Sequence, residues 1–78
     1  MGSIRILSQP IHEGSPCRIE VKGNKPVEVS IAVSGRLVAK LMVTPPITIK
    51  FKLPVDCAGK TLRVSIPDDF DTAFILPP

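Results

Sequence analysis

The fold is decided by residues 27–43, VEVSIAVSGRLVAKLMV, in the middle of the 78-residue chain. Apolar and polar side chains alternate from Val27 to Val33, and this period of two is typical of a half-buried β-strand. The pair Ser34-Gly35 then interrupts the pattern with residues suited to a tight hairpin turn. A second apolar-rich run follows from Arg36 to Val43. The segment therefore predicts a β-hairpin.

The same alternation continues on both sides of this hairpin. Further strands are predicted at residues 4–6, 17–22, 47–53, 61–66 and 72–76. Nine prolines lie almost wholly between these runs, where the missing N–H costs no ladder hydrogen bond. No segment has helical spacing, and a parallel sheet would need crossover helices. We therefore predict one all-β domain over residues 1–78, with Met1-Gly2-Ser3 including a cloning remnant.

Seven strands over this length favour a sandwich of two antiparallel sheets. We expect strands 4–6, 17–22 and 47–53 in one sheet, and strands 36–43, 27–33, 61–66 and 72–76, in that order, in the other. The side chains predicted to face each other across the sandwich are Ile4, Ile19, Val21, Ile49 and Phe51 on one side and Val29, Ile31, Leu41, Val64 and Phe74 on the other. A small Greek-key barrel is the alternative.

Two segments resemble the fibronectin type III and bacterial immunoglobulin-like modules. Residues 27–38 resemble the central hairpin of such modules in flagellar hook-capping and secreted bacterial proteins, and residues 58–64, AGKTLRV, resemble the start of their penultimate strand. The chain departs from the pattern in having no Trp for the core and no Tyr for a tyrosine corner. The resemblance implies a seven-strand immunoglobulin-like sandwich in a multidomain, extracytoplasmic protein. It assigns no functional residue.

Catalysis is poorly supported by the residues present. A chain of this length buries only about 60–65% of the surface that its unfolded form exposes, which leaves little scaffold for a deep cleft. The one histidine, His12, falls in a predicted loop between Pro10 and Pro16, a poor frame for a nucleophile and its base. We therefore expect a non-enzymatic domain without a cofactor. No apolar run is long enough to insert into a membrane.

Carboxylates and thiols suggest two further sites. Asp68, Asp69 and Asp71 fall in a predicted turn and are the oxygen ligands that calcium takes, but turn hydrogen bonds explain them more simply, so no metal is expected. Cys17 and Cys57 are predicted near the starts of two strands at the same end of facing sheets. That placement is compatible with a disulfide, and the alternative is a reduced pair.

One predicted sheet face is basic. The cations expected to point outward on it are Arg5, Arg18, Lys22, Lys50 and Lys52, opposed only by Glu20. Proteins that bind single-stranded nucleic acid add aromatic side chains on which bases stack, and none is expected on this face. A solvated face is the default interpretation, binding of an anionic polymer is the alternative, and nucleic acid is not favoured.

The predicted strand 36–43 is apolar on both faces and is expected at a sheet edge. Solitary domains protect such edges with charge, proline or bulges, and Lys40 is almost the only charge here. We expect Val38, Lys40 and Met42 to form a surface for a protein partner, either a neighbouring domain or a second copy in a weak homodimer. The alternative is an incorrect register that leaves Val38 and Met42 under a loop.

The function expected from these features is that of a structural or protein-interaction module. A module that binds carbohydrate or an anionic polymer is the alternative. The carbohydrate part of this alternative lacks the exposed Trp or Tyr rings on which sugars stack.

Overall fold

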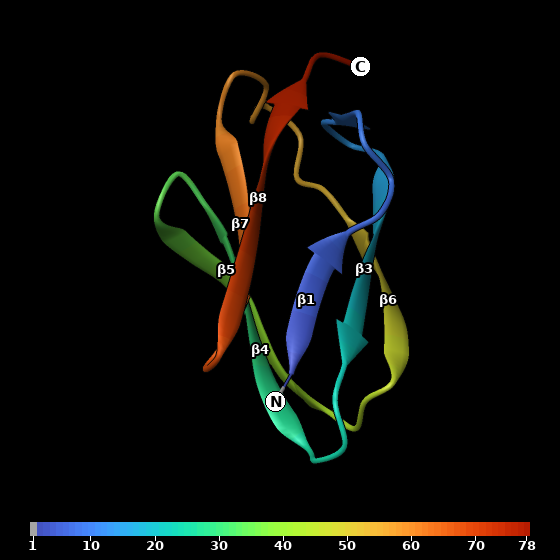
Figure 1. The fold of residues 1–78 in the computed structure, drawn as a ribbon. Coiled ribbons are helices and arrows are strands. Elements are labelled where there is room, and N and C mark those ends of the chain that lie inside the picture. The colour runs from blue at the N-terminus through green and yellow to red at the C-terminus, as the bar shows by residue number, and fades with distance from the viewer. Residues whose placement is uncertain (1) are drawn as a thin grey trace.

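The computed structural model describes residues 2–78, and Met1 lies outside the described part of the chain. It contains eight strands: β1 (Ser3–Ile6), β2 (Ile11–His12), β3 (Pro16–Lys22), β4 (Val27–Val33), β5 (Arg36–Val43), β6 (Ile47–Lys52), β7 (Thr61–Ile66) and β8 (Asp69–Leu76). One sheet has the order β1-β3-β6 and the other has the order β2-β8-β7-β4-β5. Figure 1 shows them as two facing layers. The predicted all-β class with two sheets is confirmed.

The predicted number of seven strands is too low because β2 was not expected. Ile11 and His12 pair in parallel with Ile75 and Leu76 of β8, in a segment predicted to be a loop. A strand of two residues is too short to show alternation in the sequence, and its pairing is set by β8. Because β1 belongs to one sheet and β2 to the other, the N-terminal segment crosses from the first layer to the second.

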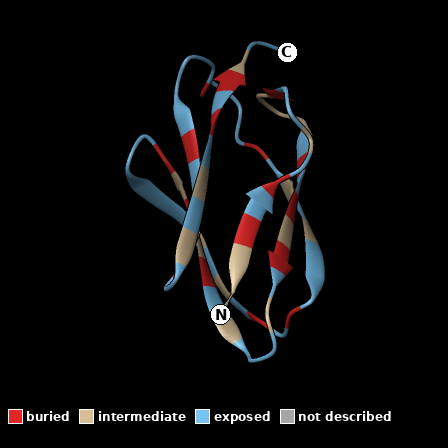
Figure 2. Cartoon of the chain, viewed as in Figure 1, coloured by how far each residue is buried: buried red, intermediate tan, exposed pale blue. Residues whose placement is uncertain are grey.

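The core lies between the two sheets, and buried residues alternate with more exposed ones along β1, β3, β4 and β7 (Figure 2). Of the ten side chains predicted to face across the sandwich, six are buried (Ile4, Ile19, Val21, Val29, Ile31 and Val64) and three are partly buried (Leu41, Ile49 and Phe51). The prediction for Phe74 is wrong, since 60% of this residue is exposed. Strand β8 starts at Asp69, and its alternation turns Ala73 and Ile75 inward and Phe74 outward. The alternation of β8 thus turns Phe74 outward although its aromatic ring is large and apolar.

The hairpin between β4 and β5 combines a tight turn with a bulge. Ser34 and Gly35 both have positive φ, at 49° and 80°, as a two-residue type I′ turn requires. The pairing of β4 with β5 then shifts register between Ile31 and Ala32, which leaves Val38 as the extra residue of a β-bulge. Because of this shift, Leu37 pairs with Ala32 and shares its outward orientation.

Candidate functional site: the β5 edge and the sheet face beside it

Strand β5 is the last strand of the five-stranded sheet, and among the residues that the structure describes β4 is its only neighbour. The backbone groups on its other side therefore have no strand partner. The edge is eight residues long and contains no proline. The sequence-based prediction had placed residues 36–43 at an edge, and the structure places them there.

Three large apolar side chains are exposed along β5. Leu37 is 55% exposed, Val38 is 41% exposed and Met42 is 67% exposed, so no loop covers the last two. Lys40 is also exposed, and its Nζ lies 3.7 Å from Oε1 of Glu28 on β4. The ammonium group of Lys40, whose charge would repel an approaching strand, is therefore directed towards β4.

The bulge divides β5 into two unequal parts. Around Val38 the extra residue disturbs the ladder and increases the local twist, which is one way in which natural sheets protect an edge. From Ala39 to Val43 the pairing with β4 is regular. The part of β5 that can accept another strand is therefore Ala39–Val43.

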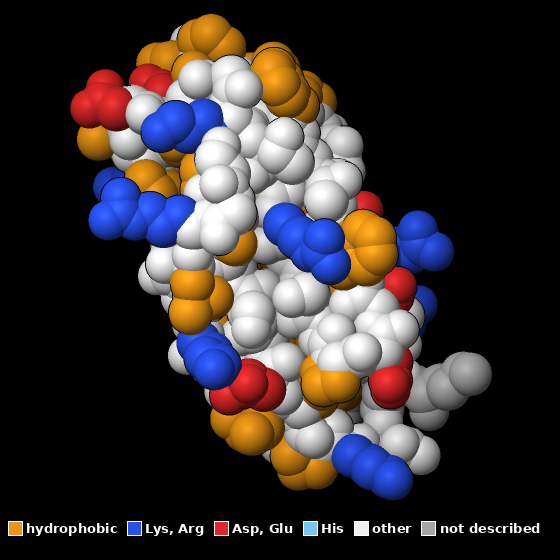
Figure 3. All heavy atoms as spheres, turned by 90° about the vertical axis from the view of Figure 1, so that its left-hand side faces the viewer, with side chains coloured by type: hydrophobic (Ala, Val, Ile, Leu, Met, Phe, Trp, Pro, Cys, Tyr) orange, Lys and Arg blue, Asp and Glu red, His pale blue; other side chains and the backbone are white. Residues whose placement is uncertain are grey.

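Two further exposed apolar side chains lie on β8, which β7 and β4 separate from β5. Phe70 and Phe74 are both exposed there, whereas Phe70 was predicted to lie in a turn and Phe74 was predicted to face the core. The guanidinium carbon of Arg63 lies 4.1 Å from the centroid of the Phe70 ring, a cation–π contact. Assigning Ala73 and Ile75 to the core would have placed both phenylalanines outward, because side chains alternate along the strand. Figure 3 shows this side of the molecule, where hydrophobic side chains are interspersed with Lys and Arg.

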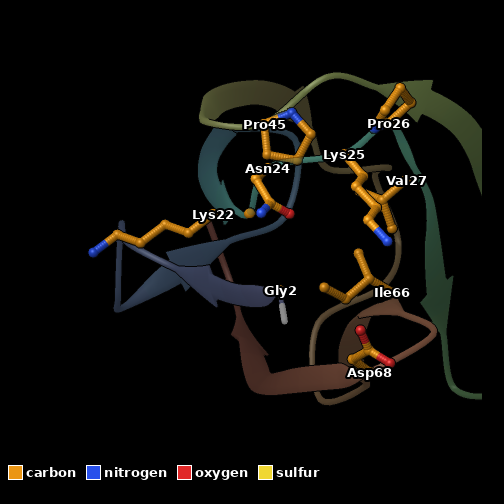
Figure 4. A pocket seen from close by; sticks show the side chains of 10 residues that line it. Gly2, Lys22, Asn24, Lys25, Pro26, Val27, Pro45, Ile66 and Asp68 are labelled. Atoms are coloured by element: carbon orange, nitrogen blue, oxygen red, sulfur yellow. The ribbon is translucent and has the colours of Figure 1, made fainter.

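Two small recesses are present. One, of about 210 Å³, lies on the outer face between β4 and β7 and is lined by Glu28, Ser30, Ser65, Ile66 and Pro67. The other, of about 170 Å³, lies at the end of the sandwich, and Lys25 and Asp68 extend towards it (Figure 4). Sites for small molecules usually measure about 300–1,000 Å³, so neither recess has the size of an ordinary ligand pocket.

The acidic segment does not form the turn that was predicted. Only Pro67 and Asp68 lie between β7 and β8, and Asp69 and Asp71 belong to β8. Asp69 Oδ2 accepts a hydrogen bond from the backbone N–H of Ile4 at 3.1 Å, and Asp71 Oδ2 accepts one from the N–H of Ile6 at 2.9 Å. These carboxylates therefore provide acceptors for two backbone N–H groups on the free edge of β1. The described residues contain no group of three or more His, Cys, Asp or Glu side chains that could hold a metal ion.

His12 and Glu13 bind backbone groups. His12 was predicted to be an exposed loop residue, but it is half-buried in β2, and its Nδ1 lies 2.7 Å from the carbonyl oxygen of Pro77. Glu13 Oε2 accepts hydrogen bonds from the N–H groups of Cys57 and Ala58, at 3.0 and 2.9 Å. Both side chains therefore tie the Pro10–Pro16 segment to neighbouring backbone.

Cys17 and Cys57 are both buried, and both are free thiols in the structure. The disulfide considered from the sequence is not formed, and Cys17 packs in the core as the alternative expected. Cys57 Sγ lies 2.9 Å from the carbonyl oxygen of Pro54. Burial raises the pKa of both thiols above their ordinary value, and the nearby carboxylate of Glu13 adds to this effect at Cys57.

The three-stranded sheet presents the predicted cations. Arg5, Arg18, Lys22, Lys50 and Lys52 are all exposed, on strands β1, β3 and β6. Glu20, half-buried on β3, lies among them, and Lys22 Nζ approaches its Oε1 to 3.8 Å. This face points away from β5, because the two belong to different layers.

No family model matches the chain, and neither a curated protein nor a solved structure is significantly similar to it. Within the described residues, no helix is long and apolar enough to cross a bilayer.

Proposed function

We propose that this chain is a non-catalytic, immunoglobulin-like module that holds protein partners, and that a second copy of the domain docks on β5. The observation that carries the proposal is the open β5 edge with its exposed Leu37, Val38 and Met42. A protein without a partner at such an edge exposes both unpaired backbone groups and apolar side chains.

The order of the strands supports the immunoglobulin-like assignment. Strands β1, β3 and β6 face strands β8, β7, β4 and β5, which is the arrangement expected from the resemblance of residues 27–38 and 58–64. Strand β2 adds a short parallel partner to β8 without changing the order of the others.

The use of the polar side chains supports a non-catalytic role. Nucleophiles and bases must face a site where a substrate can reach them. His12, Glu13, Asp69 and Asp71 instead bind backbone groups of neighbouring segments. Among the described residues, no polar or charged residue is fully buried, and the recesses are small.

The sequence of β5 selects the register of the proposed contact. In an antiparallel pair of two copies centred on Leu41, Lys40 of each copy lies opposite Met42 of the other, and Ala39 lies opposite Val43. The lysine stem then packs on the methionine while its ammonium group stays in water. Centring the pair on Lys40 would place two lysines opposite each other, which is unfavourable.

The expected affinity is low. Burying Val38 and Met42 recovers about 2–4 kcal/mol at about 25 cal/mol per Å², before the cost of association is subtracted. In a symmetric pair this gain is made twice, and after an association cost of about 4 kcal/mol a net of up to about 4 kcal/mol remains. This corresponds to a Kd of about 1 mM or weaker, so free copies remain monomeric at ordinary concentrations. A short tether between neighbouring domains supplies a millimolar effective concentration, at which the contact is about half-populated. We therefore propose that the module belongs to a multidomain protein.

Sedimentation equilibrium over protein concentrations up to about 1 mM tests this proposal. We expect a reversible monomer–dimer equilibrium that weakens at least tenfold in the variant carrying Val38→Lys and Met42→Lys. The matched control carries Leu7→Lys and Val55→Lys, which replace exposed apolar residues away from β5. A wild-type protein that stays monomeric, or a control that weakens association as much, would overturn the proposal.

A further inference from the structure

The exposed cations of the three-stranded sheet are an unusual concentration of charge. Arg5, Arg18, Lys22, Lys50 and Lys52 against the single carboxylate of Glu20 give this face a net charge of +4. The whole chain carries +3 at pH 7, so the rest of the molecule carries −1. The net positive charge of the protein therefore lies on one face.

The register arranges four of these cations in a diagonal stripe. On β6, Lys52 lies opposite Pro16 of β3, and Lys50 lies opposite Arg18 of β3. On β1, Arg5 lies opposite Glu20, which is two residues beyond Arg18 along β3. With a strand separation of about 4.8 Å and a rise of about 3.4 Å per residue, the Cα atoms of neighbouring cationic residues are roughly 5–8 Å apart. The stripe is about 17 Å long by the same geometry.

The stripe is electrostatically unfavourable in the free protein. Like charges directly opposite each other destabilise a sheet, and Arg18 and Lys50 form such a pair. The ion pairs found among the described residues join Lys22 to Glu20 and Lys40 to Glu28, and neither involves the four cations of the stripe. A bound polyanion would neutralise these charges and release counterions.

We propose that the stripe binds a linear acidic polysaccharide, a chain of sugars that carries sulfate or carboxylate groups. The face has no aromatic platform, since Phe51 is partly buried against the core, so it offers no ring on which the bases of single-stranded nucleic acid could stack. An acidic polysaccharide does not need such a ring here, because its anionic groups rather than its sugar faces would contact the cations. Glu20 and Thr48 lie level with Arg5 and supply acceptors for sugar hydroxyls. Duplex DNA presents no hydroxyl groups to them along its length.

Binding of a fluorescent heparin oligosaccharide to the full chain, followed by anisotropy at 50–200 mM salt, tests the inference. The variant carrying Arg18→Gln and Lys50→Gln should bind at least tenfold more weakly, and its slope of log K against log salt should fall by about two. The matched control carries Arg36→Gln and Lys60→Gln, which remove the same charge from other surfaces. It should change the affinity by less than threefold.

Three results would overturn the inference. The first is the absence of heparin binding at 50 mM salt. The second is equal weakening in the two double variants, which would show that only net charge matters. The third is binding of a duplex or single-stranded DNA of similar charge as tightly as heparin, which would assign the face to nucleic acid. Neutral dextran serves as the uncharged control, and it should not bind.

Discussion

Asp69 and Asp71 show how two side chains replace a missing strand neighbour. Strand β1 pairs with β3 on one side only, and the N–H groups of Ile4 and Ile6 point away from that ladder towards β8. Buried or half-buried N–H groups need an acceptor, and carboxylates are the strongest acceptors available. The two layers of the sandwich are thus joined by hydrogen bonds as well as by the apolar core.

Replacing Asp71 tests this role. We expect Asp71→Ala to lower the free energy of unfolding by about 1–2 kcal/mol, because the N–H of Ile6 loses a charged acceptor. The exposed Asp68 forms no such bond, and Asp68→Ala should change stability by less than about 0.5 kcal/mol. Urea denaturation measures both values. Equal effects of the two substitutions would contradict the role assigned to Asp71.

The burial of the two thiols can be tested by alkylation. Burial raises the pKa of Cys17 and Cys57 above the ordinary value of 9.0, so both remain protonated in the folded protein at neutral pH. As the pH rises past 9, the unfolded chain ionises first, and the stability that the buried thiols contribute below that pH is lost. At pH 8, iodoacetamide should therefore modify the folded protein far more slowly than the urea-unfolded chain. Equal rates would contradict the burial of both thiols.

At the scale of elements, the hairpin β4–β5 carries most of the predictable structure. Its alternation and its Ser34-Gly35 turn are local features, and the structure has both where the sequence placed them. The bulge at Val38 could not be predicted, because it depends on how β5 registers against β4. The phase of β8 was missed for a related reason, since Asp69 and Asp71 face β1, a strand distant in the sequence, and contact it through carboxylates rather than through apolar side chains.

The turn of this hairpin should be sensitive to the loss of glycine. Gly35 has φ of 80°, and nothing lies within 4 Å of the position that a Cβ would take. The cost of Gly35→Ala is therefore backbone strain alone, about 1–2 kcal/mol. Gly35→Asn should cost less, because Asn tolerates this conformation better. Thermal denaturation of the two variants gives the comparison, and an Ala variant as stable as the wild type would show that the turn is not of the assigned type.

For the whole molecule, the two layers have different surfaces. The three-stranded sheet presents cations, and the five-stranded sheet presents exposed apolar side chains along β5 and β8. The sequence predicted the cations from alternation within single strands, and it predicted the β5 edge from the expected order of the strands in the sheet. It did not predict Phe70 and Phe74, or the use of Asp69, Asp71 and Glu13 as backbone acceptors, because these depend on contacts between distant segments.

The central claim is that Ala39–Val43 of β5 pairs with a second copy of the domain. Its most direct test is a concentration series of ¹H–¹⁵N correlation spectra from about 50 μM to 1 mM. We predict that the amide shifts which change with concentration cluster on Ala39–Val43 and on the adjacent residues of β4, and that they stay constant in the variant with Val38→Lys and Met42→Lys. Concentration-dependent shifts confined to β1, β3 and β6, or no shifts at all, would contradict the claim.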